Sequence, residues 1–134
     1  MAFGMLKPVE GSSSKTLFFG LPGNPVAVMV TFLAFVRPAL LKLMGVADVA
    51  AHTPPLLKAR CLEPLRKKPG RTEYQRGTVS TAADGTLQVR TTGNQGSGVL
   101  SSMVEGNGLI VLHHAQGNVA VGDEVDVMVF DGVI

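Results

Sequence analysis

The sequence Leu-Pro-Gly-Asn-Pro at residues 21–25 directly follows an apolar run. A glycine turn that leads a strand into a helix presents backbone N–H groups and the positive end of the helix dipole, and both attract phosphate or another oxyanion. Pro22 and Pro25 stiffen the loop, so donors around Gly23 and Asn24 would be preorganised. An ordinary strand-to-helix turn with Asn24 as its N-cap fits the same residues, and both interpretations stay open.

Arg76 is a second candidate for binding an anion, because it lies inside a strand pattern. A planar guanidinium suits bidentate capture of phosphate or carboxylate. The alternatives are a solvated face and a salt bridge to residues 78–134, which hold six acids against one arginine. Six further basic residues share residues 46–77 with Arg76. Of these, Lys67, Lys68 and Arg71 are predicted to lie in an exposed, solvated loop.

Residues 93–98, Gly-Asn-Gln-Gly-Ser-Gly, form a third candidate. Glycines around polar residues can form a nest of backbone donors to which Ser97 adds a hydroxyl, although ordinary turn chemistry explains the same composition. His113 and His114 suggest a metal only at first sight, because neighbouring side chains on a strand point to opposite faces. We interpret them as a strand-end pair without a role. We find no Ser/His/Asp set, no paired carboxylates and no metal site.

Composition limits the possible function. The chain has 134 residues with 46% hydrophobic and 16% charged residues, which suits a folded domain. A formal net charge of +2 is too small to make nucleic acid the expected partner. The single cysteine, Cys61, excludes an intramolecular disulfide and a cysteine-rich zinc site, and it fits a reducing cytosol. We see no signal peptide pattern and expect a cytoplasmic protein.

Around the first candidate loop the pattern is strand, loop, helix. Residues 16–19 predict a strand buried on both faces. A helix should run from Pro25 to about Met44, end at Gly45 and be kinked by Pro38. This helix is apolar nearly all round, but its apolar run meets Arg37 well short of the roughly 20 residues that a bilayer requires. We therefore expect a buried helix and no membrane span.

Beyond a linker at residues 47–55, the pattern becomes that of strands. Glycine turns separate these segments, which indicates a small β-barrel or bent-ribbon domain from about residue 46 to the end. A turn is predicted at residues 82–85. The predicted strands are residues 56–62, 72–80, 86–91, 109–112, 119–121 and 124–130.

The first region is too small to cover its own helix. One helix with one or two strands cannot bury a helix that is apolar on every face. The helix must therefore pack on a second chain or on more of the same polypeptide. We favour the second explanation, in which this sequence is the carboxyl-terminal piece of something longer.

The sequence also resembles the MoeA family, the molybdopterin molybdotransferases, whose eukaryotic relatives include the E domain of gephyrin. The likeness covers essentially the whole chain. The residues that carry it are Phe-Gly-Leu-Pro-Gly-Asn-Pro-Val at 19–26, Pro-Gly-Arg at 69–71, Tyr-Gln-Arg-Gly at 74–77, Thr-Thr-Gly-Asn-Gln-Gly-Ser at 91–97, Gly-Asn-Val at 117–119 and Val-Gly at 121–122.

The resemblance implies an α+β fragment with two parts. Residues 1–45 would be the end of a MogA-like α/β domain that binds molybdopterin (domain III), and residues 46–134 a small all-β domain of the β-clip or barrel type (domain IV). It also implies a homodimer. In the family, Pro22, Gly23, Asn24 and Pro25 match the loop that lines the substrate cleft, and Arg76 and Ser97 match positions that face it.

The reaction implied is insertion of molybdate into adenylylated molybdopterin with release of AMP, assisted by Mg²⁺. The family's catalytic acids and Mg²⁺-linked carboxylates lie in preceding domains and match nothing here, so no catalytic or metal-binding residue is assigned and this chain alone should be inactive. A noncatalytic protein-interaction or dimerisation module of the same family is the alternative.

Overall fold

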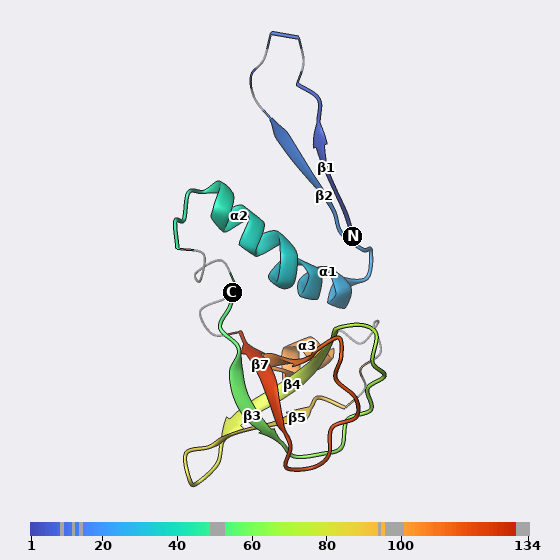
Figure 1. Ribbon diagram of the computed structural model, residues 1–134, viewed down its shortest axis with the longest axis vertical. Coiled ribbons are helices and arrows are strands. Elements are labelled where there is room, and N and C mark those ends of the chain that lie inside the picture. The colour runs from blue at the N-terminus through green and yellow to red at the C-terminus, as the bar shows by residue number, and fades with distance from the viewer. Residues whose placement is uncertain are drawn as a thin grey trace. The chain divides into compact units, whose positions relative to one another are not determined.

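The computed structural model describes residues 1–8, 10–11, 13, 15–48, 53–93, 95 and 101–130, apart from the side chains of residues 102 and 103. The chain divides into two compact units, Met1–Thr53 and Pro54–Ile134 (Figure 1). Within these residues, the first unit holds a strand pair and a helix, and the second holds the strands of a barrel and a short helix.

The first unit begins with a two-stranded antiparallel ribbon of β1 (Ala2–Leu6) and β2 (Thr16–Gly20). Their register runs from Ala2 opposite Gly20 to Leu6 opposite Thr16. The strand predicted at residues 16–19 is confirmed, but its burial on both faces is wrong, because β2 pairs with β1 alone and the Phe18 side chain is 52% exposed. β1 was not predicted.

A single long helix follows, made of α1 (Pro25–Thr31), a π-helical turn η1 (Phe32–Val36) and α2 (Arg37–Leu43) (Figure 1). The predicted start is confirmed, and Gly45 follows the helix with a φ of 84°, as a glycine stop requires. The Arg37 N–H donates to the carbonyl of Phe32, five residues earlier. This wide turn immediately precedes Pro38, which has no N–H to donate.

The stretch Pro25–Leu43 is long and apolar enough to cross a membrane, judged by length and composition alone. The sequence argument that the apolar run stops too early at Arg37 does not hold for the helix as folded, because the helix continues through Arg37 and Pro38 to Leu43. Val26, Leu33 and Val36 are buried, but the other residues of the helix are partly or fully exposed, so the expectation of a buried helix is not confirmed.

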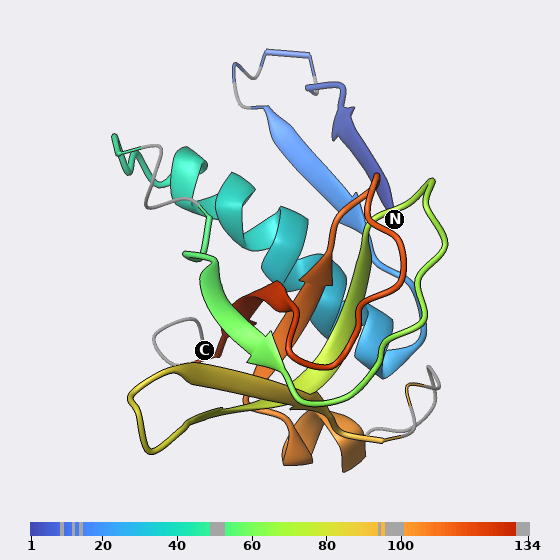
Figure 2. The ribbon, with the colours of Figure 1, turned by 60° about the horizontal axis from the view of Figure 1, so that its bottom comes forward.

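The second unit is a closed barrel with the strand order β3-β5-β4-β6-β7, in which β7 also pairs with β3 (Figure 2). All pairs are antiparallel except β3 with β5, which is parallel. Each strand matches a predicted one, whereas the segment predicted at residues 119–121 forms only an isolated bridge between Leu65 and Val119. The strands are β3 (Leu57–Cys61), β4 (Glu73–Thr81), β5 (Leu87–Thr91), β6 (Gly108–Leu112) and β7 (Glu124–Val129).

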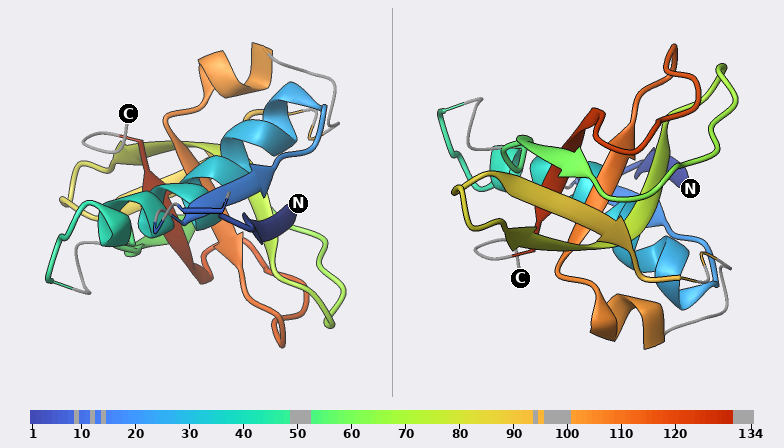
Figure 3. Two further views of the ribbon diagram at one scale, coloured as in Figure 1. Left: turned by 90° about the horizontal axis from the view of Figure 1, so that it is seen from above. Right: turned by 90° about the horizontal axis from the view of Figure 1, so that it is seen from below.

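The barrel encloses one apolar core. Its fully buried members come from β3, β5, β6 and β7 and include Cys61, Val89, Leu112 and Val127. The short helix α3 (Ser101–Glu105), which was not predicted, lies outside the ring of strands (Figure 3). It contacts β4, where the Thr78 hydroxyl lies 3.4 Å from the Glu105 carbonyl.

β4 changes its partner halfway along its length. Its first half pairs with β6 and its second half with β5, and Gly77 is the residue at which both ladders end. Two side-chain amides continue the hydrogen bonding beyond these ends. Asn107 accepts from the Val79 N–H (2.7 Å) and donates to the Val79 carbonyl (2.9 Å), and Gln95 does the same for Arg76.

Candidate functional site

The loop at residues 22–25 is held by its asparagine. The Asn24 side chain accepts hydrogen bonds from the N–H groups of Val26 (3.0 Å) and Ala27 (3.2 Å), which confirms it as the N-cap, and Pro25 occupies the first helical turn as predicted. The Asn24 carbonyl accepts from the Val28 N–H at 2.9 Å. The loop is therefore rigid at the point where it enters the helix.

The same contacts change what this loop offers to an anion. The sequence analysis expected unused N–H groups at the helix start, but Pro25 has none and those of Val26, Ala27 and Val28 are taken by Asn24. That expectation is wrong for these three donors. Gly23 is open, since a Cβ built on it would meet nothing within 4 Å. Binding of substrate by Pro22, Gly23, Asn24 and Pro25 stays a prediction.

Arg76 is buried in β4, with a side chain that is 4% exposed, so the alternative of a solvated face is excluded. Burial lowers the pKa of its guanidinium, because the surroundings solvate its charge less well than water does. A buried arginine needs an anionic or polar environment around its planar head. Binding of an anion by Arg76 stays a prediction.

The backbone of Arg76 is fixed by residues from the glycine-rich segment after β5. The Arg76 N–H donates to Gln95 Oε1 (2.8 Å), and Gln95 Nε2 (3.0 Å) and the Thr92 N–H (3.1 Å) both donate to the Arg76 carbonyl. Sequence reasoning singled out this segment as a possible nest but missed Gln95. Ser97, the predicted contributor of a hydroxyl, lies outside the described residues.

A hollow of about 430 Å³ opens beside this arrangement and is lined by Thr78, Arg90, Thr91, Thr92 and Glu105. Within the described part of the chain, the buried Thr92 hydroxyl has no hydrogen-bond partner. Such an atom is costly to bury alone and is a natural contact for a bound molecule. The Thr-Thr-Gly motif at residues 91–93 was the one sequence signal for this hollow. Nothing in the sequence indicated that β4 and α3 also line it.

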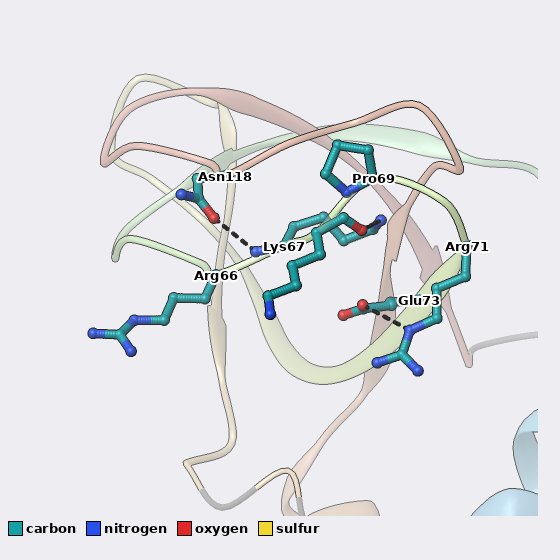
Figure 4. A pocket seen from close by; sticks show the side chains of 7 residues that line it. Arg66, Lys67, Pro69, Arg71, Glu73 and Asn118 are labelled. Atoms are coloured by element: carbon teal, nitrogen blue, oxygen red, sulfur yellow. Dashed lines mark hydrogen bonds and ion pairs between the residues drawn. The ribbon is translucent and has the colours of Figure 1, made fainter.

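A second hollow, of about 500 Å³, lies among the basic residues that follow β3 (Figure 4). The prediction of an exposed loop is wrong for Lys67, whose side chain is 4% exposed. Its ammonium donates to the Lys68 carbonyl at 2.6 Å and its backbone N–H to Asn118 Oδ1 at 2.9 Å. Lys68 and Arg71 are exposed, as predicted.

His113 has a structural partner that the sequence analysis did not expect. Its Nε2 lies 2.6 Å from Asp126 Oδ2, and Lys58 Nζ lies 2.8 Å from Asp126 Oδ1. These contacts lower the pKa of Asp126, mainly through the Lys58 hydrogen bond and secondarily through His113, and the same carboxylate raises the pKa of Lys58. The interpretation of His113 as a residue without a role is therefore wrong.

A metal ion in a protein requires several ligand side chains close together. Over the described ranges of the chain, no three His, Cys, Asp or Glu side chains come close enough to bind one ion. Cys61 is a buried core residue, and burial raises the pKa of its thiol. A buried, protonated thiol is a poor nucleophile and a poor metal ligand.

Known proteins with similar sequences bear on these residues. Molybdopterin molybdenumtransferase of Haemophilus influenzae is 36% identical over 124 residues, which are 92% of this chain and 30% of that protein. Gephyrin of Dictyostelium discoideum is 35% identical over 114 residues, which are 82% of this chain and 16% of that protein. The chain thus spans less than a third of the length of either relative.

Solved structures agree with the sequence relatives. The structure of the molybdopterin biosynthesis moeA protein of Pyrococcus horikoshii matches this chain with a TM-score of 0.64 and 26% identity. The match covers 80% of this chain and 26% of the Pyrococcus horikoshii chain. A molybdenum cofactor biosynthesis protein of Pyrococcus furiosus matches with a TM-score of 0.61 and 32% identity. This match covers 80% of this chain and 36% of the Pyrococcus furiosus chain. The α+β organisation with a small barrel is therefore that of MoeA proteins.

The barrel itself corresponds to a defined family region. The family described as MoeA C-terminal region (domain IV) matches residues 58–130, which run from β3 through β7 and make up more than half of the chain. The buried arginine of β4, the hollow beside it and the basic hollow all lie within this match. The chain therefore belongs to the MoeA family, and its barrel is the family's domain IV.

Proposed function

We propose that this chain is the C-terminal part of a molybdopterin molybdotransferase, which inserts molybdate into adenylylated molybdopterin and releases AMP. The match of residues 58–130 to domain IV carries this proposal. The Haemophilus influenzae and Nostoc relatives, both named molybdopterin molybdenumtransferase, align with 92% and 84% of the chain and support it.

In this proposal the two regions have different roles. Residues 1–45 are the end of a MogA-like domain III that binds molybdopterin, and residues 46–134 are domain IV. The division of the chain into two compact units supports this assignment. Mg²⁺ is bound by residues of other domains, and this chain alone binds substrate without turning it over.

The proposed substrate-binding residues are Arg76 and Ser97 of domain IV together with the loop Pro22, Gly23, Asn24 and Pro25. Both substrates are anionic, and a guanidinium stays protonated even when burial lowers its pKa. Gln95, which holds the Arg76 backbone, precedes Ser97 by only two residues in the sequence. Thr92 also donates its N–H to the Arg76 carbonyl, and its hydroxyl has no hydrogen-bond partner among the described residues, which supports a ligand contact at this place.

The proposed protein works as a homodimer in the cytoplasm. Several large apolar side chains of the first unit are exposed, which is typical of surfaces that contact another domain or subunit. The exposed side chains include those of Phe3, Met5, Phe18, Phe35 and Leu43.

A noncatalytic interaction or dimerisation module is the second candidate function. The similarity to gephyrin of Dictyostelium discoideum favours it.

A chimera tests the enzymatic proposal. Residues 1–134 replace the aligned region of the Haemophilus influenzae relative, and the purified chimera is supplied with adenylylated molybdopterin, molybdate and Mg²⁺ while AMP release is followed. We expect AMP release that depends on molybdate. Arg76→Ala should lower it at least about 100-fold, since charge-assisted contacts that position substrate are worth several kcal/mol.

Arg60→Ala is the matched control, because Arg60 is an exposed arginine of β3 in the same barrel. It should leave AMP release within about twofold of the unsubstituted chimera. A folded, dimeric chimera that releases no AMP would refute the enzymatic role and favour the interaction module. Equal activity of the Arg76 and Arg60 variants would refute the assignment of Arg76.

A further inference from the structure

The basic hollow is built from two loops of the barrel that are fastened to each other. Leu65 and Val119 exchange two backbone hydrogen bonds of 2.9 and 3.0 Å, and the Gly70 N–H donates to the His114 carbonyl at 2.8 Å. Between them, the Lys67 N–H donates to the Asn118 side chain. The rim of the hollow is therefore in place before any ligand arrives, which lowers the entropic cost of binding.

Lys67 is an unusual residue for such a place. Lys67 is only 4% exposed, and no carboxylate of the described residues forms an ion pair with it. Lysine is almost never buried this deeply without a partner. The Lys68 carbonyl takes one of its three ammonium donors, which leaves two for another acceptor.

The charges around Lys67 are unbalanced. Arg66, Lys68 and Arg71 also line the hollow, and among the residues that the structure describes Glu73 is the one acid that does so. Glu73 is already engaged, since its Oε1 lies 3.2 Å from Arg71 Nε (Figure 4). The remaining positive charge matches an acceptor that carries more than one negative charge, as a phosphate group does and a single carboxylate does not.

We propose that this hollow binds the phosphate group of a small phosphorylated ligand, with Lys67 as the buried anchor and Arg66 and Lys68 at the rim. At about 500 Å³, the hollow has room for more than the phosphate itself. It is separate from the place of Arg76, because Glu73 and Arg76 stand three residues apart on β4 and so on opposite faces of the strand. The proposal does not rest on the enzymatic function.

Calorimetric titration of the full chain at low salt tests this proposal, with inorganic phosphate, pyrophosphate and AMP as three separate ligands. Lys67→Met removes the ammonium and keeps an apolar stem. Asn118→Asp keeps the acceptor for the Lys67 N–H and the size of the side chain, but adds a negative charge, so it tests the hollow without emptying a buried position. Arg60→Met, which removes an exposed cation of β3, is the control.

We expect saturable binding of at least one of these ligands, weakened at least about tenfold by Asn118→Asp and by Lys67→Met and less than about twofold by Arg60→Met. If AMP binds more tightly than phosphate and pyrophosphate, the ligand is a nucleotide. If pyrophosphate binds most tightly of the three, the ligand is a polyphosphate. An absence of saturable binding up to about 10 mM ligand would refute the proposal. Equal affinities of the wild type and a folded Asn118→Asp variant would also refute it.

Discussion

At the scale of single residues, Asp126 is a carboxylate with two basic partners, Lys58 and His113. Lys58 holds one of its oxygens and His113 the other, and its side chain is 14% exposed. Its pKa in the folded protein is lowered, so its contribution to stability is present above the pKa of the unfolded chain and is lost as the pH falls through the folded value.

We predict from this that Asp126→Asn lowers stability near neutral pH and removes part of the acid sensitivity. The stability difference between wild type and variant should be largest near pH 6. It should shrink as the pH falls below about 4, the usual pKa of an unfolded aspartate, and through the lower pKa of the folded protein. Urea unfolding at a series of pH values measures it. Glu124→Gln, the control, removes an exposed carboxylate of the same strand and should not lower stability in this pH-dependent way. A stability difference for Asp126→Asn that does not change with pH would contradict the prediction.

The sequence was informative about single residues wherever the chemistry was local. Asn24 was predicted as an N-cap because its partners are the next residues along the chain, and it is one. Gln95 and Lys67 were missed for the opposite reason. Their roles depend on Arg76 and on Asn118, which are 19 and 51 residues away, and no pattern in a single sequence states those pairings.

At the scale of elements, Gly77 is where β4 exchanges one partner strand for the other. A Cβ at this position would lie 3.0 Å from the Arg90 carbonyl oxygen, 3.0 Å from Val89 Cγ2 and 3.1 Å from Ile110 Cγ1. Neighbours on both sides thus approach the backbone closely, and the main chain next to Arg76 depends on the absence of a side chain here.

Gly77→Ala should therefore destabilise the barrel by about 1–3 kcal/mol, the usual cost of overpacking. Gly23→Ala is the control, because a Cβ there meets nothing within 4 Å, and it should change stability by less than about 0.5 kcal/mol. Chemical denaturation of both variants measures the difference. Equal stabilities would mean that the strands move apart at no cost.

All five barrel strands were predictable as elements because glycine turns and β-forming runs mark them locally. One of those turns shows why. The Asp84 side chain accepts from the Thr86 N–H at 2.9 Å and Gly85 has a φ of 85°, so the turn at residues 82–85 forms within its own sequence. The parallel pairing of β3 with β5 and the helix α3 were not predictable, because both depend on contacts with strands distant in the chain.

At the scale of the whole molecule, the barrel has a core of its own. Every member of its buried cluster, from Ala59 to Val127, belongs to the second unit. We predict that residues 54–134 alone fold and unfold cooperatively. Circular dichroism during heating tests this, and a gradual loss of signal without a transition would contradict it.

The sequence indicated the presence of two regions but not their exposed surfaces. Strand β2 was expected to be buried because Leu17, Phe18 and Phe19 are apolar, yet it lies in a ribbon of two strands. Apolar composition indicates that a segment packs against another surface, but it does not indicate which chain or domain provides that surface.

The ring of strands also bears on the order of folding. β7 is the last of the barrel strands along the chain and pairs with both β6 and β3, and β3 is the first strand of the barrel. The ring cannot close while synthesis of β7 is incomplete, so the Arg76 strand and its neighbours remain an open sheet until then. Closure joins residues as far as seventy positions apart, such as Leu57 and Val127, and contacts this distant in sequence form slowly.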